Sequence, residues 1–185
     1  GLPIFTTGSK SLGWLGMLFL MGVLGWSFGT LLYTYFYLRL YSAEWPQGGL
    51  PLPARLMPGL LYAAIPLAAG ALGGAWNAFR GGHKRSCMFG LAAGCVLMVL
   101  FLVFHLYHLS RVGFTPQTNA YGSIFFMLSG TVDLLVLIGL NMAGSALVRI
   151  WREVEHWRLY VALHVQMAAH YGYFAAAVAV VVYGT

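Results

Sequence analysis

The chain has 185 residues, of which 60% are hydrophobic and only 8% are charged, and its mean hydropathy is +0.78. A soluble globule of this size cannot hide so much apolar surface, so we predict an integral membrane protein. The formal net charge of +6 comes from basic residues beside the predicted spans rather than from a basic stripe on a folded face, which excludes a nucleic-acid-binding protein.

The first residues, 1–13, show no charged region followed by a short apolar core and a cleavage site, so we expect no removable signal peptide. Five later segments each supply the roughly 20 mostly apolar residues that a transmembrane helix needs. The predicted spans are 12–39, 58–79, 88–109, 122–149 and 159–182. No connection is long enough to form a domain, so residues 1–185 are predicted to be one all-α domain of five transmembrane helices.

The basic residues of the connections predict the orientation of the chain. The loops on the side of the N-terminus carry Lys10, Arg80, Lys84, Arg85, Arg149, Arg152 and Arg158. The loops on the other side carry Arg39, Arg55 and Arg111. By the positive-inside rule, the N-terminus is cytoplasmic and the C-terminus lies outside.

Glycines four residues apart mark one face of three predicted spans, where helix backbones can approach each other closely. These pairs are Gly25 and Gly29, Gly70 and Gly74, and Gly90 and Gly94. We therefore expect the spans to pack as a bundle.

One carboxylate, Asp133, falls deep inside a predicted span, about 18 Å from its outer end. On the next span, His170 lies at a similar depth, so neighbouring antiparallel helices would allow a hydrogen bond between the two. The same arithmetic places Asn141 level with His164. These four residues are candidates for helix–helix contacts with a protonated Asp133, for proton movement, or for contact with lipid headgroups or water.

Two histidines, His105 and His108, share a face near the outer end of the third span. A haem would need two axial ligands facing each other at one depth, and the remaining membrane histidines lie much deeper. We therefore predict interfacial hydrogen bonding for this pair. No catalytic, cofactor-binding or metal-binding constellation can be assembled from the other side chains.

The stretch 119–130, NAYGSIFFMLSG, closely resembles a signature of subunit III of the haem-copper oxidases, which include cytochrome c oxidase and its quinol-oxidising relatives. The matching residues are Tyr121, Gly122, Ser123, Phe125, Phe126 and Gly130, with Gly139 further on. A second stretch, 35–53, is similar to an early helix exit and Trp-Pro loop of this family through Tyr35, Tyr37, Arg39, Trp45, Pro46 and Gly49. The last span resembles the final family helix, with His170 as its histidine.

The resemblance implies a subunit without metal that packs against catalytic subunit I of the oxidase, beside subunit II, and holds phospholipid. Haems and copper would belong to those partners, and the shorter family members also have five spans. Where the family has His-Gly-x-His, this chain reads VDLL at 132–135, which suggests that a polar contact has moved to Asp133 and His170. We expect the chain in the bacterial inner membrane rather than the mitochondrial one.

Two other functions stay open at this point. One is a b-haem-binding membrane anchor that uses His105, His108, His164 or His170. The other is a small proton-coupled transporter with Asp133 as its coupling site.

Overall fold

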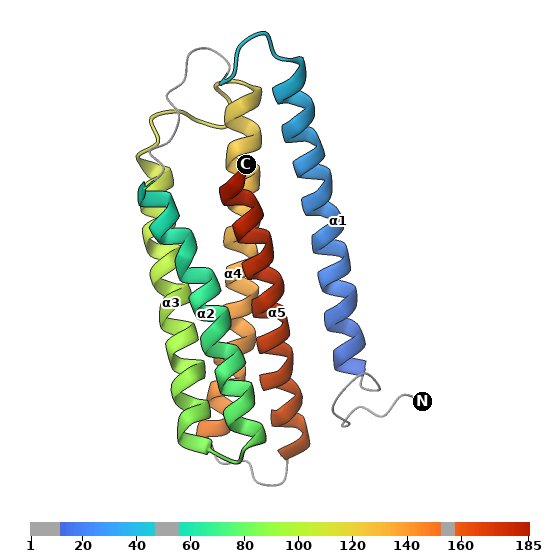
Figure 1. Cartoon of the computed structure of the whole chain (residues 1–185), viewed down its shortest axis with the longest axis vertical. Helices are drawn as coiled ribbons and strands as arrows, with labels where there is room; N and C mark the ends of the chain where they lie inside the picture. The colour runs from blue at the N-terminus through green and yellow to red at the C-terminus, as the bar shows by residue number, and fades with distance from the viewer. Residues whose placement is uncertain (1–11, 47–55, 153–157) are drawn as a thin grey trace.

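The computed structural model describes residues 12–46, 56–152 and 158–185 (Figure 1). Within these ranges the chain forms five α-helices, and all five are long and apolar enough to cross a membrane. They are α1 (Leu12–Tyr41), α2 (Leu56–Arg80), α3 (Lys84–Ser110), α4 (Ala120–Trp151) and α5 (Arg158–Gly184). The five predicted spans are confirmed. The first helix begins at its predicted residue, and every other helix end lies one to four residues beyond the predicted one.

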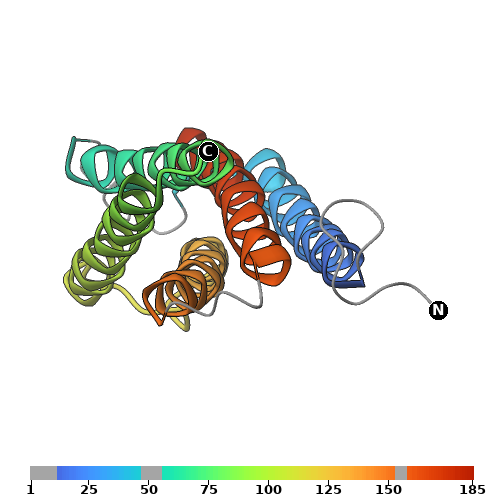
Figure 2. The ribbon, with the colours of Figure 1, turned by 90° about the horizontal axis from the view of Figure 1, so that it is seen from below.

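Four of the helices form a ring, and the first helix lies outside it. Each of α2, α3, α4 and α5 contacts its two neighbours in that cyclic order, whereas α1 packs mainly beside α4 and α5 (Figure 2). Consecutive helices run in opposite directions. The predicted neighbourhood of the fourth and fifth spans is therefore confirmed.

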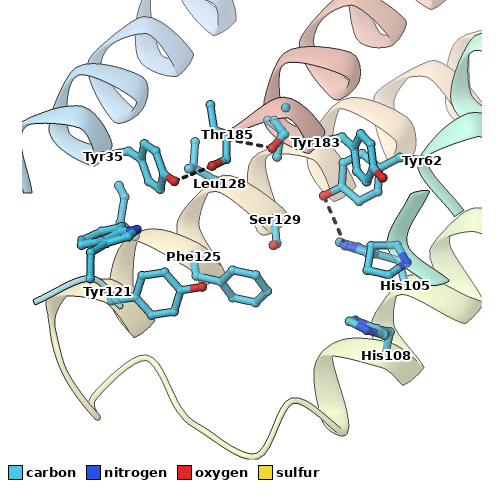
Figure 3. Close-up of a pocket in the computed structure, with 15 residues that line it drawn as sticks. Tyr35, Tyr62, His105, His108, Tyr121, Phe125, Leu128, Ser129, Tyr183 and Thr185 are labelled. Atoms are coloured by element: carbon cyan, nitrogen blue, oxygen red, sulfur yellow. Dashed lines mark hydrogen bonds between the residues drawn. The ribbon is translucent and has the colours of Figure 1, made fainter. Parts of the chain in front are cut away.

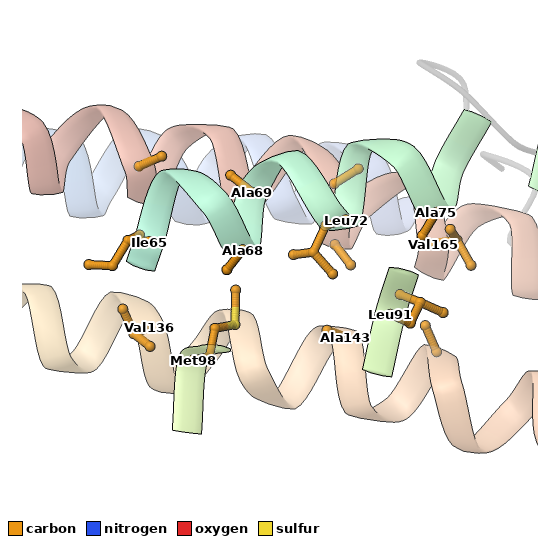
Figure 4. Close-up of a cluster of buried hydrophobic side chains, with 14 of the residues drawn as sticks. Ile65, Ala68, Ala69, Leu72, Ala75, Leu91, Met98, Val136, Ala143 and Val165 are labelled. Carbon is orange, nitrogen blue, oxygen red and sulfur yellow. The ribbon is translucent and has the colours of Figure 1, made fainter. Parts of the chain in front are cut away.

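The interior of the ring is filled by apolar side chains from all four helices (Figure 4). On α2 the inward positions repeat every three or four residues, as helix geometry requires for a continuous buried face. The fully or almost fully buried residues include Ile65, Ala68, Leu72, Leu91, Met98, Val136, Ala143 and Val165. A second apolar cluster joins α1 to α4 and α5 around Met17, Phe28, Leu135 and Tyr171.

Small residues bring α2 and α3 close together, as the pair Gly90 and Gly94 predicts. A Cβ atom added at Gly90 would lie 2.9 Å from the carbonyl oxygen of Ala71. One added at Gly94 would lie 2.8 Å from the Leu72 side chain. Only glycine permits this approach, so the prediction for the third span is confirmed.

The other two glycine pairs behave differently. Added Cβ atoms at Gly70, Gly74 and Gly29 would have nothing within 4 Å, and one at Gly25 would meet only the Phe174 ring at 3.7 Å. Within the described residues, the prediction of close packing through Gly70 and Gly74 is therefore wrong. The face of α2 that packs against its neighbours carries alanine and leucine instead.

Candidate functional site

A buried hydrogen-bond partner explains how the carboxylate of Asp133 is accommodated inside α4. The Nδ1 atom of His105, on α3, lies 2.7 Å from the Asp133 Oδ1 atom. The two side chains are 4% and 15% exposed, respectively. Placing the proton on Nδ1 lets the imidazole donate to the carboxylate, which leaves Nε2 as an acceptor.

A tyrosine extends this pair to a third helix. The hydroxyl group of Tyr62, on α2, lies 3.4 Å from the His105 Nε2 atom (Figure 3). The His105 ring also stacks on Phe101, with centroids 4.9 Å apart. A polar chain Tyr62–His105–Asp133 therefore links α2, α3 and α4 through an otherwise apolar interior.

The partner of Asp133 differs from the one that the sequence predicts. His170 instead donates from Nδ1 to the carbonyl oxygen of Gln166 at 2.8 Å, and its ring meets Trp14 edge-on at 5.0 Å. The predicted Asp133–His170 hydrogen bond is therefore wrong. His170 lies on the side of α5 that faces α1, whereas Asp133 points toward α3.

The prediction of interfacial hydrogen bonding is also wrong for His105, which is only 3% exposed. That prediction requires the ends of α3 and α4 to lie at one level. However, α4 begins well beyond the end of α3 (Figure 1), so a residue near the end of α3 lies level with one far inside α4. His108, one turn further along α3, is less buried.

For the second predicted pair, Asn141 and His164, the structure gives the burial of each residue but does not test their hydrogen bond. Asn141 is exposed on α4, and His164 is half-buried on α5. A hydrogen bond between them stays a prediction.

The residues of the 119–130 stretch build the start of α4. The side chain of Asn119 accepts a hydrogen bond from the backbone N–H of Gly122 at 2.8 Å, which caps the helix. The hydroxyl of Ser123 donates to the carbonyl oxygen of Pro116 at 2.5 Å. A Cβ atom at Gly122 would lie 2.7 Å from the Thr115 carbonyl oxygen, so the loop before α4 requires glycine here.

Aromatic residues from the two signature stretches, 35–53 and 119–130, meet beside the start of α4. The Trp45 ring lies edge-on to Tyr121 at 5.1 Å and to Tyr35 at 5.5 Å. Phe125 stacks with Tyr121 at 6.2 Å, and Phe126 contacts Phe114. Arg39 is exposed, Pro46 follows a cis peptide bond, and Gly130 lies on the outer face of α4. Gly49 lies outside the described residues.

Four of these aromatic residues, Tyr35, Trp45, Tyr121 and Phe125, border a cavity of about 450 Å³ at the end of the bundle where α2 and α4 begin (Figure 3). The opposite side of the cavity is formed by Tyr62, His105, His108 and Tyr183. None of the described lining residues is Lys, Arg, Asp or Glu. The polar chain through His105 therefore reaches the cavity, while the carboxylate of Asp133 stands behind the imidazole.

Tyr62 is not identified from the sequence, and His105 is assigned there to the interface rather than to Asp133, although a signal for the burial of His105 exists. It continues the buried positions of α3, which recur every three or four residues at Cys87, Leu91, Gly94, Met98 and Phe101. A histidine on that stripe is a core residue. Among the described residues, no group of three or more histidine, cysteine or acidic side chains is arranged to hold a metal ion.

Comparison with the sequences of known proteins places the chain in one family. The chain matches the sequence model of the family described as cytochrome c oxidase subunit III over residues 10–184. It is 34% identical over 88 residues to cytochrome c oxidase subunit 3 of Debaryomyces hansenii, covering 47% of this chain and 33% of that protein. The subunit 3 of Lycodon semicarinatus is 29% identical over 137 residues, which are 73% of this chain and 48% of that protein.

A further relative, cytochrome c oxidase subunit 3 of Candida parapsilosis, is 31% identical over 120 residues, covering 63% of this chain and 40% of that protein. The chain thus spans about a third to a half of the length of these curated relatives. The family match nevertheless covers almost the whole chain and includes all five helices. The chain therefore belongs to the cytochrome c oxidase subunit III family.

Proposed function

We propose that the chain is a non-catalytic accessory subunit of a haem-copper respiratory oxidase, which holds lipid and supports catalytic subunit I beside subunit II. The observation that carries this proposal is the family match over residues 10–184. The haems and copper would belong to the partner subunits. The complex would reduce oxygen and translocate protons in an energy-transducing membrane, for which the bacterial inner membrane stays our prediction.

The charges at the two ends of the bundle support the predicted orientation. The end where α1, α3 and α5 begin carries Arg80, Lys84, Arg85 and Arg149. Arg39 and Arg111 lie at the opposite end. The excess of positive charge supports a cytoplasmic N-terminus, an outer C-terminus, and a cavity that lies toward the outer side.

An exposed stripe on α4 is the surface that we propose for the contact with subunit I. It consists of Met127, Gly130, Leu134, Leu137 and Asn141, which are spaced three or four residues apart. A Cβ atom at Gly130 would have nothing within 4 Å, so a partner helix can approach the backbone there. Asn141 lies about 15 Å from the end of α4 and would need a hydrogen-bond partner at that membrane depth.

Lipid contact would fall mainly on α1. Phe19 and Trp26 are 79% and 82% exposed, and only Met17, Phe28 and Tyr35 are buried on this helix. Near the outer end, the rings of Tyr33, Tyr37 and Tyr41 form a continuous row. Tyrosines at an interface and an arginine such as Arg39 suit lipid headgroups, while the deeper apolar face suits acyl chains.

The proposal is tested by purifying an affinity-tagged chain in mild detergent and recording the visible spectrum and subunit masses of the complex. We expect a haem-containing complex with subunits I and II. The variant Gly130→Leu should lose that complex while the chain remains folded, because a large side chain blocks the stripe.

The matched control is Gly70→Leu, since a Cβ at Gly70 also has nothing within 4 Å but lies on α2. This variant should keep the complex. A tagged chain that carries no other subunit would contradict the proposal that it belongs to an oxidase complex. Equal retention of the complex by both variants would contradict the proposed contact through α4.

A further inference from the structure

The cavity at the outer end of the bundle presents a polar floor that the supporting role does not use. His105 and Tyr62 both line the cavity, and both are buried, at 3% and 8% exposed. Asp133 does not line the cavity but holds the Nδ1 atom of His105 at 2.7 Å. The carboxylate thereby fixes the imidazole with Nε2 on the cavity side.

The Nε2 atom of His105 makes only a weak hydrogen bond within the chain. Its contact with the Tyr62 hydroxyl is 3.4 Å, beyond the usual range of hydrogen bonds to nitrogen. A ligand hydroxyl in the cavity would be a better donor to Nε2. Conversely, an imidazolium balanced by Asp133 would donate from Nε2 to a ligand carbonyl.

The walls of the cavity suit a flat ring. As Figure 3 shows, Tyr35 and Tyr121 lie on one side, and Tyr62 and Tyr183 lie on the other. Trp45 belongs to the first side, because its ring lies edge-on to both Tyr35 and Tyr121. Aromatic rings that line a slot recognise another ring through stacked and edge-on contacts. Hydroxyl groups of Tyr121 and Ser129 also border the cavity and can serve a second ligand oxygen.

The charge of the lining argues for a neutral ligand. The described lining contains two histidines but no lysine or arginine, so a phosphate headgroup would lack the permanently charged partner that it normally finds in proteins. The volume of about 450 Å³ falls within the range of pockets that hold small organic ligands.

We propose that this cavity binds the headgroup of a quinol or quinone, with one ring oxygen on the His105 Nε2 atom and Asp133 positioning the imidazole. Such a headgroup is neutral, flat and aromatic or quinoid, and it carries oxygens on opposite sides of the ring. This binding goes beyond the accessory role and involves no electron transfer within the chain.

The test uses the full chain in mild detergent and a photoreactive azidobenzoquinone with a decyl tail. Illumination should label peptides that contain 121–129 or 182–185, and unlabelled decylbenzoquinone should compete. Decylbenzene, which has the same tail but no ring oxygens, should compete poorly. Equal competition by decylbenzene, or labelling confined to other segments, overturns the proposal.

A variant pair tests the role of the imidazole. The double variant His105→Phe with Asp133→Leu replaces the buried pair by apolar groups, so the chain should stay folded. Its affinity for decylbenzoquinone should fall about tenfold, as expected for one lost hydrogen bond. The control His170→Phe removes a histidine that does not line the cavity and should leave the affinity unchanged.

Unchanged affinity in the folded double variant overturns the proposal, as does full loss of labelling on adding one equivalent of phosphatidylglycerol. Both results leave the accessory role untouched, because co-purification with the oxidase subunits is measured separately. Conversely, a chain that binds the quinone but carries no oxidase subunits would contradict only the accessory role.

Discussion

At the scale of single residues, the pair formed by His105 and Asp133 is the feature of this bundle whose burial costs the most hydration free energy. A lone carboxylate or imidazole in an apolar interior loses its hydration without compensation. At 2.7 Å the two side chains compensate each other, and Tyr62 adds a weaker third contact. Removing one member therefore costs more than removing both.

This asymmetry predicts a rescue. Asp133→Leu alone and His105→Phe alone should each destabilise the purified chain by about 1–3 kcal/mol, because each leaves a buried polar partner unpaired. The double variant should regain most of that loss. Unfolding by increasing fractions of denaturing detergent, followed by circular dichroism, measures all three.

The matching cycle with Asp133→Leu and His170→Phe should be additive, since those side chains contact different groups. Additive losses for Asp133 and His105, or strong coupling between Asp133 and His170, would show that the described pairing is not the one in the membrane.

The sequence alone identifies Asp133 as a residue that needs a partner, but it names the wrong one. Depth along a helix follows from residue number, whereas the relative height of two helix ends depends on the loop that joins them. Here the connection 111–119 places the start of α4 beyond the end of α3, which brings His105 level with Asp133. The spacing of the buried positions on α3 predicts that His105 faces the interior, and this is the information needed to identify the partner of Asp133.

At the scale of elements, helix packing depends on where the small residues point. The five helices follow from apolar segments that exceed the thickness of a bilayer, which is why the spans are predictable. Which glycines face a neighbour is less predictable, because the rotation of each helix depends on all of its contacts. Gly90 and Gly94 face α2, while Gly70 and Gly74 face away.

A pair of substitutions tests this rotation. Gly90→Ala should destabilise the chain by about 1–3 kcal/mol, because its Cβ would lie 2.9 Å from the Ala71 carbonyl oxygen and the Ala75 Cβ. Gly74→Ala should be neutral or stabilising by less than about 1 kcal/mol, since its Cβ has open space and alanine favours helix. Thermal unfolding in detergent distinguishes the two. Equal effects would contradict the described interface between α2 and α3.

At the scale of the whole molecule, the bundle has a closed ring and an outlying helix. The ring of α2 to α5 buries its own core, whereas α1 exposes most of its apolar surface. A helix with so little contact inside its own chain depends on lipid or on another subunit for the rest. This incomplete burial fits a protein whose stable form is a complex.

The proposed role of the chain is to support an oxidase without taking part in its chemistry. The most direct measurement is oxygen consumption by the purified complex with and without this subunit, followed over many turnovers at equal haem content. We predict that the complex without the chain starts at a similar rate per haem but loses activity sooner. Complete loss of the initial rate with normal haem spectra, or an unchanged rate and lifetime, would contradict the account.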